Sequence, residues 1–133
     1  MAWVQPKVLW YSDDYINYTD YNRIKNDVEA LYDMLTDPDF ELADMGEDKA
    51  VNDLWYADEV NTILDNLDLI AREIGMAFNK PYYFPNGNTP NNVELGYIEH
   101  KLLLIYNRIN GQSEALYLGQ GGYLGTRIQN RLL

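Results

Sequence analysis

Three stretches of the chain repeat one spacing of apolar residues, and this pattern limits the possible folds more than any other feature. Within each stretch the apolar residues follow one another in steps of three or four, which places them on one face of an α-helix. These residues are Tyr21, Ile24, Val28, Leu31 and Leu35; Val60, Ile63, Leu67, Ile70 and Ile74; and Leu95, Ile98, Leu102, Ile105 and Ile109. The sequence therefore predicts a mainly α protein, a helical bundle in which three helices share one core.

Local signals set the expected bounds of these helices. The first is expected over 20–35 with Thr19 as its N-cap, and the third over 90–109 with Thr89 as its N-cap, because a threonine hydroxyl can accept a free N–H of the first turn. The second is expected over 57–74. Residues that commonly stop helices follow each stretch, namely Asp37-Pro38, Gly75 and Asn110-Gly111.

The segments outside the helices differ in composition from the core. Residues 1–18 are expected to form an extended aromatic N-terminal arm, and residues 112–133 a Gly-rich C-terminal tail in which the glycines act as a hinge. Residues 19–111 hold the three-helix core, and the whole chain has the length of a single domain. Trp3 and Trp10 should be buried, either on the arm's own core or on a neighbouring molecule.

The charge of the chain is strongly acidic and unevenly distributed. The formal net charge is −11; residues 1–100 carry six basic and twenty acidic residues, whereas residues 101–133 carry four basic residues and one acidic residue. This balance argues against binding to nucleic-acid phosphates. It fits either a body that docks head to tail with another copy or a basic partner, or a solvated acidic surface with a few basic residues near a helix end.

Other sequence features exclude several kinds of processing. The chain has no cysteine, which rules out disulfides and thiolate metal sites. Its first residues lack the basic and apolar regions of a signal peptide, and no apolar run is long enough to span a bilayer. We therefore expect no membrane partner.

No group of residues has the spacing of a catalytic or cofactor site. The glycines of residues 119–125 do not match a dinucleotide-binding loop. His100, the only histidine, is expected near the edge of a buried helix face and has no cysteine partner. Residues 37–48 match a calcium loop only loosely, because Leu42 stands in place of the glycine and Asp48 in place of the glutamate. We expect no enzyme activity, no cofactor and no metal.

A protein without catalytic groups acts through contacts, and the two end segments offer suitable side chains. Aromatic and arginine residues contribute most to the energies of protein interfaces. The interface residues expected on this basis are Trp3, Trp10, Tyr117, Tyr123, Arg127 and Arg131.

The segment from residue 10 to residue 24, WYSDDYINYTDYNRI, contains a tryptophan and an aromatic–Asn pair that lead into Asp-x-Asn-Arg-Ile, followed by Asn26 and Val28. Weaker copies begin at Val60 and Tyr106. This segment resembles a recurring segment of tail-associated structural proteins in bacteriophages that infect Gram-positive bacteria. The resemblance implies a virion component near the tail tip, the baseplate or the site of fibre attachment.

The same resemblance implies a set of partners and a location. The protein would be made in the host cytoplasm and act in the virion, with other virion proteins as partners and with itself as a homo-oligomer. The chain lacks the large C-terminal fibre part of longer members of the family. This difference favours an adaptor or connector over a receptor-binding protein.

Two other binding roles stay open on the sequence. The rings of Tyr82, Tyr83 and Phe84 could stack on sugars, which would suit a glycan-binding module of a phage adhesion device. The acidic surface could instead imitate DNA, which would suit an inhibitor of a nucleic-acid enzyme.

Overall fold

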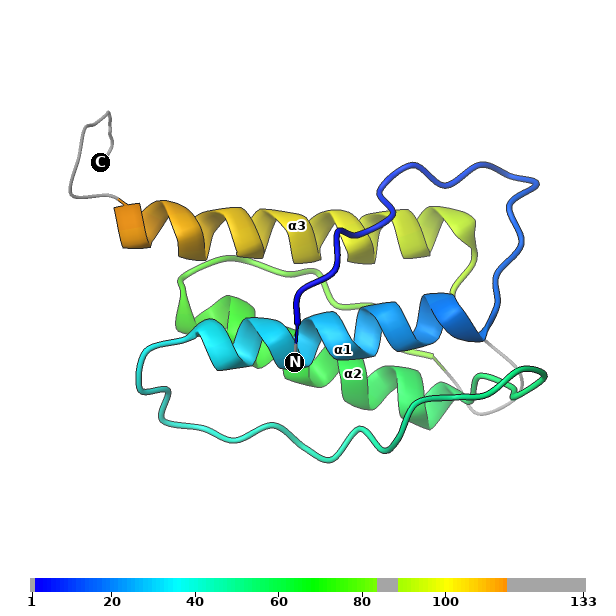
Figure 1. Ribbon diagram of the computed structural model, residues 1–133, viewed down its shortest axis with the longest axis horizontal. Coiled ribbons are helices and arrows are strands. Elements are labelled where there is room, and N and C mark those ends of the chain that lie inside the picture. Colours follow the sequence, from blue (N-terminus) through cyan, green and yellow to red (C-terminus); the bar gives the residue numbers. More distant parts are fainter. Residues whose placement is uncertain (1, 84–88, 115–133) are drawn as a thin grey trace.

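The protein is a three-helix structure, as the repeated apolar pattern predicted. The computed structural model describes residues 2–83 and 89–114, and within these ranges it contains three helices and no strand (Figure 1). Helix α1 spans Tyr18–Met34, α2 spans Ala57–Glu73 and α3 spans Asn92–Glu114. The mainly α fold class is therefore confirmed. The expected Gly-rich tail lies almost entirely beyond the described residues.

The predicted apolar stripes form the core. All of their residues are buried except Leu35 and Ile74, and these two are partly buried and pack against the others. Tyr83 joins the core from outside the helices, at 5% exposure. The periodicity thus identified the helix faces that meet in the interior.

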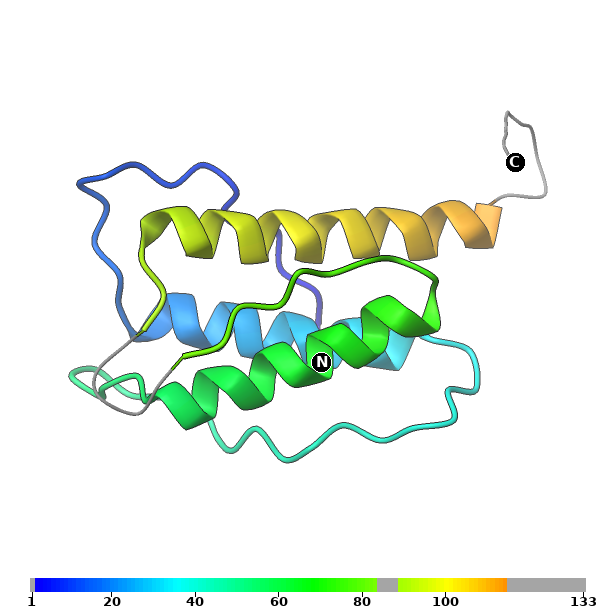
Figure 2. The same cartoon turned by 180° about the vertical axis from the view of Figure 1, so that it is seen from behind.

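All three helices run in the same direction, a feature that the apolar stripes do not encode. Each begins at one end of the molecule and ends at the other (Figures 1 and 2). A helix of 17 residues is about 25 Å long, so the chain must return over that distance before each new helix starts. The connections 35–56 and 74–91 provide this length, and the first runs along the outside of α1 and α2.

Asparagine side chains on the helices hold these returning connections. Each of the three amides donates to a backbone carbonyl and accepts from the backbone N–H of the same residue, with distances of 2.7 to 2.9 Å. The pairs are Asn22 with Lys49, Asn66 with Ala43, and Asn61 with Tyr83. An extended segment cannot pair its backbone within a helix, so these amides supply the partners that it needs.

The helix N-caps differ from the expected threonines. The Asn17 side chain accepts from the N–H of Thr19, and the Asp20 carboxylate accepts from the N–H of Asn17. Asn91 and Glu94 form the same reciprocal pair at the start of α3. Thr19 therefore lies in the first turn of α1, and Thr89 lies outside α3. An asparagine with an acidic residue three positions later satisfies two free N–H groups, whereas a threonine alone satisfies one.

The helix ends agree with the sequence signals in one case and differ in another. Gly75 follows α2 with φ of 76°, a conformation that favours glycine, and its N–H donates to the carbonyl of Arg72. Gly111, in contrast, does not stop α3, which continues to Glu114. A glycine inside a helix costs only about 1 kcal/mol, so Gly111 by itself is a weak stop signal.

Replacing Asn66 by alanine should lower the free energy of unfolding by about 2 kcal/mol, because two hydrogen bonds to the backbone of Ala43 are lost. Chemical denaturation followed by circular dichroism measures this change. The matched control is Asn107→Ala, which changes an exposed asparagine of α3 and should cost less than about 0.5 kcal/mol. Equal losses in the two variants would contradict the role given to Asn66.

Candidate functional site

The N-terminal arm packs on the protein's own core. The backbone N–H of Val4 donates to the Asp27 carboxylate of α1 at 2.8 Å, and that of Lys7 donates to the Glu99 carboxylate of α3 at 2.9 Å. The arm thus lies across α1 and α3 (Figure 1). The sequence left open whether it would pack on its own helices or on a neighbour, and the structure places it on its own helices.

Glu99 is the centre of this arrangement and is completely buried. Its two carboxylate oxygens lie 2.7 Å from Nε and Nη2 of Arg23, and they also accept the N–H of Lys7 and the indole N–H of Trp10 at 2.9 Å. A buried carboxylate is costly unless it is paired and hydrogen-bonded. These four bonds meet that requirement and join α1, α3 and the arm.

Arg23 is held between two carboxylates. Its Nη2 atom lies 2.7 Å from Glu99 and 2.9 Å from Asp20. Burial acts to lower the pKa of the guanidinium, but the hydrogen bonds and charges of Glu99 and Asp20 outweigh it and raise the pKa above its ordinary value. Arg23 therefore stays charged and serves the fold rather than a ligand.

Asp27 is a buried acid with an incomplete set of partners. One oxygen accepts the N–H of Val4, while Oδ2 has no hydrogen-bond partner within the described part of the chain. Burial and, to a lesser extent, the charge of Glu99 raise the pKa of Asp27 from 3.8 to about 7, while the bond from Val4 and the charge of Arg23 act in the opposite direction. A carboxyl of this kind makes the stability of the fold depend on pH.

Trp3 and Trp10, expected as interface residues, both contact α3. The Trp3 ring stacks on Tyr106 with centroids 4.2 Å apart and an angle of 5° between the planes. The Trp10 indole donates to Glu99, and the ammonium of Lys7 lies 3.9 Å from its ring centroid. Each ring is partly buried, so only part of its surface is open to another molecule.

The expected sugar-binding rings do not form one platform. Tyr82 is 60% exposed, but Tyr83 is 5% exposed and held by Asn61, so it cannot stack on a sugar. Phe84 lies outside the described residues. The pattern missed this difference because two successive residues of an extended segment point in opposite directions.

The remaining sequence candidates fall into two groups. His100 is exposed on α3, not at the edge of the buried face, because the neighbouring Glu99 takes the buried position. The other expected interface residues lie outside the described residues; they are Tyr117, Tyr123, Arg127 and Arg131.

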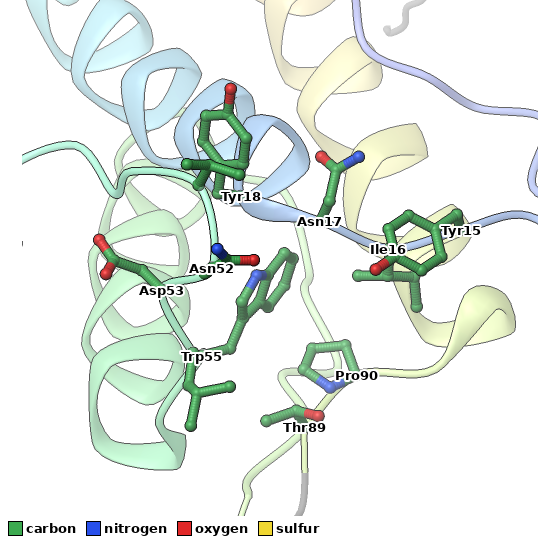
Figure 3. Close-up of a pocket in the computed structure, with 11 residues that line it drawn as sticks. Tyr15, Ile16, Asn17, Tyr18, Asn52, Asp53, Trp55, Thr89 and Pro90 are labelled. Carbon is green, nitrogen blue, oxygen red and sulfur yellow. The ribbon is translucent and has the colours of Figure 1, made fainter.

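An open cleft of about 610 Å³ lies at the end of the molecule where all three helices begin. Three segments that are distant in the sequence form its walls (Figure 3). The lining residues are Tyr15, Ile16, Asn17, Tyr18, Val51, Asn52, Asp53, Leu54, Trp55, Thr89 and Pro90. We call this feature the end cleft.

Trp55 organises the end cleft. Its indole extends toward the centre, between Ile16 and Asn17 on one side and Asn52 and Asp53 on the other (Figure 3). The ring also packs edge to face on Tyr21, with centroids 5.3 Å apart. Because Tyr21 belongs to the core of α1, the helix packing positions the aromatic surface of the cleft.

One wall of the end cleft is a tight turn that exposes apolar side chains. The Asp53 carboxylate accepts the N–H of Ala50 at 2.7 Å, and the N–H of Asp53 donates to the carbonyl of Ala50 at 3.0 Å. This turn leaves Val51 and Leu54 each 66% exposed, and Tyr15 on the opposite wall is 82% exposed. Exposed apolar residues gathered around a cleft are typical of binding surfaces.

The lining of the end cleft suits binding better than acid–base chemistry. Among the described residues that line it, Asp53 is the one carboxylate, and there is no histidine, lysine or arginine. Elsewhere in ranges 2–83 and 89–114, no three acidic or histidine side chains are grouped to hold a metal ion. No helix in these ranges combines the length and apolarity needed to cross a bilayer.

Comparisons of this chain with models of protein families, with curated proteins and with solved structures found no match. The observation in the described structure that bears on function is therefore the geometry of the end cleft.

Replacing Glu99 by glutamine should lower the free energy of unfolding by about 3 kcal/mol, because Arg23 loses the fully buried one of the two carboxylates that compensate its charge. The tryptophan fluorescence should shift to longer wavelength as the arm loosens around Trp10. The control is Glu73→Gln, at an exposed position of α2. A Glu99 variant as stable as this control would contradict the role given to the buried pair.

Replacing Asp27 by asparagine should stabilise the protein at neutral pH. The folded protein keeps a proton on Asp27 up to a pKa of about 7, whereas the unfolded chain releases it near 3.8. The unfolded state therefore binds fewer protons between these values, and the free energy of unfolding falls as the pH rises from 4 to 7. The asparagine variant lacks this fall and should be on the order of 2 kcal/mol more stable than the wild type above pH 7.

Denaturation curves across this pH range measure the difference between the Asp27→Asn variant and the wild type. The matched control is the same substitution at the exposed Asp39. A difference for Asp27→Asn that stays constant between pH 4 and pH 8 would show that the pKa of Asp27 is not raised.

Proposed function

We propose that this protein is a non-enzymatic structural component that acts through protein–protein assembly, as an adaptor or connector in the tail, baseplate or fibre region of a phage virion. The observation that supports an assembly role most directly is the end cleft with its exposed apolar rim. Exposed side chains of this kind gain free energy when a partner covers them.

The contacts that hold the walls of the end cleft also support a binding role. The core residue Tyr21 packs against Trp55, and the paired bonds between Ala50 and Asp53 close the turn that carries Val51. A surface that is already ordered loses little conformational entropy when it binds. Such a surface suits a connector, which must present the same shape to each neighbour.

The phage context of the proposal comes from the sequence resemblance. Two polar residues of that motif have roles inside the fold: Asn22 binds the backbone of Lys49, and Arg23 pairs with Glu99. A motif with these roles would mark a shared way of packing an arm and a connection on a first helix. The surfaces that contact partners would then differ from one member of the family to another.

The arrangement of charges gives less support to the alternative function, in which the acidic surface imitates DNA. Several carboxylates are used within the fold and are not free to represent phosphates. Asp20 and Glu94 bind helix N-termini, and Asp27 and Glu99 bind the arm. Those that remain at the surface are spread over connections and helices.

Detection of the protein in purified particles tests the proposal. The gene should lie among tail genes, and mass spectrometry should find the protein in phage particles released from the host. Leu54→Asp, which places a charge on the rim of the end cleft, should lower its amount in particles more than tenfold. Leu69→Asp is the matched control on α2, at a side chain that is 37% exposed.

Absence of the wild-type protein from the particles would overturn the phage assignment. Equal incorporation of the two leucine variants would overturn the assignment of the end cleft as the assembly surface.

A further inference from the structure

We propose that the end cleft binds residues 115–133 of a second copy of this chain, so that copies associate head to tail. This inference rests on the proposed assembly function and names the occupant of its binding surface. The occupant is identified by the position at which the described chain leaves the bundle, by its residue types and by its charge.

The direction of the helices places the end cleft and the start of this segment at opposite ends of the molecule. Pro90, which lines the cleft, lies two residues before α3, and α3 ends at Glu114 (Figures 1 and 2). A helix of 23 residues is about 35 Å long. Glu114, the last described residue, therefore lies far from its own cleft, and next to the cleft of a copy stacked in line with it.

The segment has the residue types that the end cleft accommodates. Its sequence is ALYLGQGGYLGTRIQNRLL, which contains leucines, tyrosines and an isoleucine but no acidic residue. The cleft exposes Tyr15, Val51 and Leu54, and its volume of about 610 Å³ lies within the range of about 300–1000 Å³ typical of ligand clefts. A few side chains of the segment fill such a space, so a short part of it serves as the anchor.

The charges of the two partners are complementary. The segment carries Arg127 and Arg131, whereas residues 1–114 carry eight basic and twenty-one acidic residues. Asp53 lies in the lining of the cleft and is exposed. Charges of opposite sign increase the rate of association and disfavour wrong orientations of the partners. Added salt screens these charges and weakens both effects.

This contact uses different surfaces on the two copies. An interface between unlike surfaces leaves one free cleft and one free segment after each step, so assembly continues until a ring closes or a filament grows. This outcome is suited to a connector, because it provides an end to which a different virion protein can bind.

Two variants of the full chain test this pairing by complementation. Leu54→Asp inactivates the cleft and keeps the segment, whereas the double change Arg127→Glu and Arg131→Glu inactivates the segment and keeps the cleft. In size-exclusion chromatography with light scattering, the wild type should form species larger than a dimer, whose mass falls as salt is raised. Each variant alone should associate at least tenfold more weakly than the wild type.

An equimolar mixture of the two variants should form a 1:1 dimer and nothing larger, because it contains one working cleft and one working segment. The Leu69→Asp control should assemble as the wild type does. A synthetic peptide of residues 115–133, added in excess, should reduce the wild-type assembly to single copies.

Three results would overturn the inference. They are a wild type that stays monomeric at all concentrations, a mixture of variants that does not associate, and soluble cell-wall glycan that binds the cleft while the peptide does not. A monomeric protein that is nevertheless present in phage particles would overturn head-to-tail association alone. Absence from particles, with self-association intact, would overturn the phage function alone.

Discussion

The structure depends on the buried ion pair between Arg23 and Glu99. This pair joins α1 to α3, and the same carboxylate binds the backbone of Lys7 and the ring of Trp10. The apolar stripes alone would allow the helices to slide or rotate, because burial of apolar area has little directional preference. A charged pair with fixed geometry permits one register. One contact therefore fixes the relative position of two helices and, together with the contacts of Val4 and Trp3, the position of the arm.

The parallel course of the helices explains the rest of the architecture. Antiparallel helices need only short loops, whereas these helices are joined by connections of 22 and 18 residues. Asn22, Asn61 and Asn66 bind these connections as they return along the bundle. Because every helix then begins at the same end, three segments converge there and enclose the end cleft.

The sequence predicted those features that depend on local spacing. The spacing of the apolar residues predicted which face of each helix is buried, and Gly75 ends α2 as expected. The predicted N-caps of α1 and α3 were wrong because asparagine and threonine are both common at this position. The acidic residue three positions later is what distinguishes the asparagine caps. Pairing of Arg23 with Glu99 spans 76 residues, and no local pattern encodes it. The length of the two connections was the one sequence signal for the cleft. Connections this long allow the chain to return to the same end before each helix begins.

The asparagine contacts have a consequence for how the surface can change. Each amide binds only main-chain atoms of the connection, so the residue at the contacted position is free to change where its side chain makes no contact of its own. Ala43 is such a position because it is exposed, whereas Lys49 pairs with Glu59 and Tyr83 is buried in the core. Any residue other than proline can stand at position 43 without losing the paired bonds to Asn66. Natural selection could therefore diversify this position at little cost to folding, and a foreign side chain displayed there would leave the scaffold unchanged.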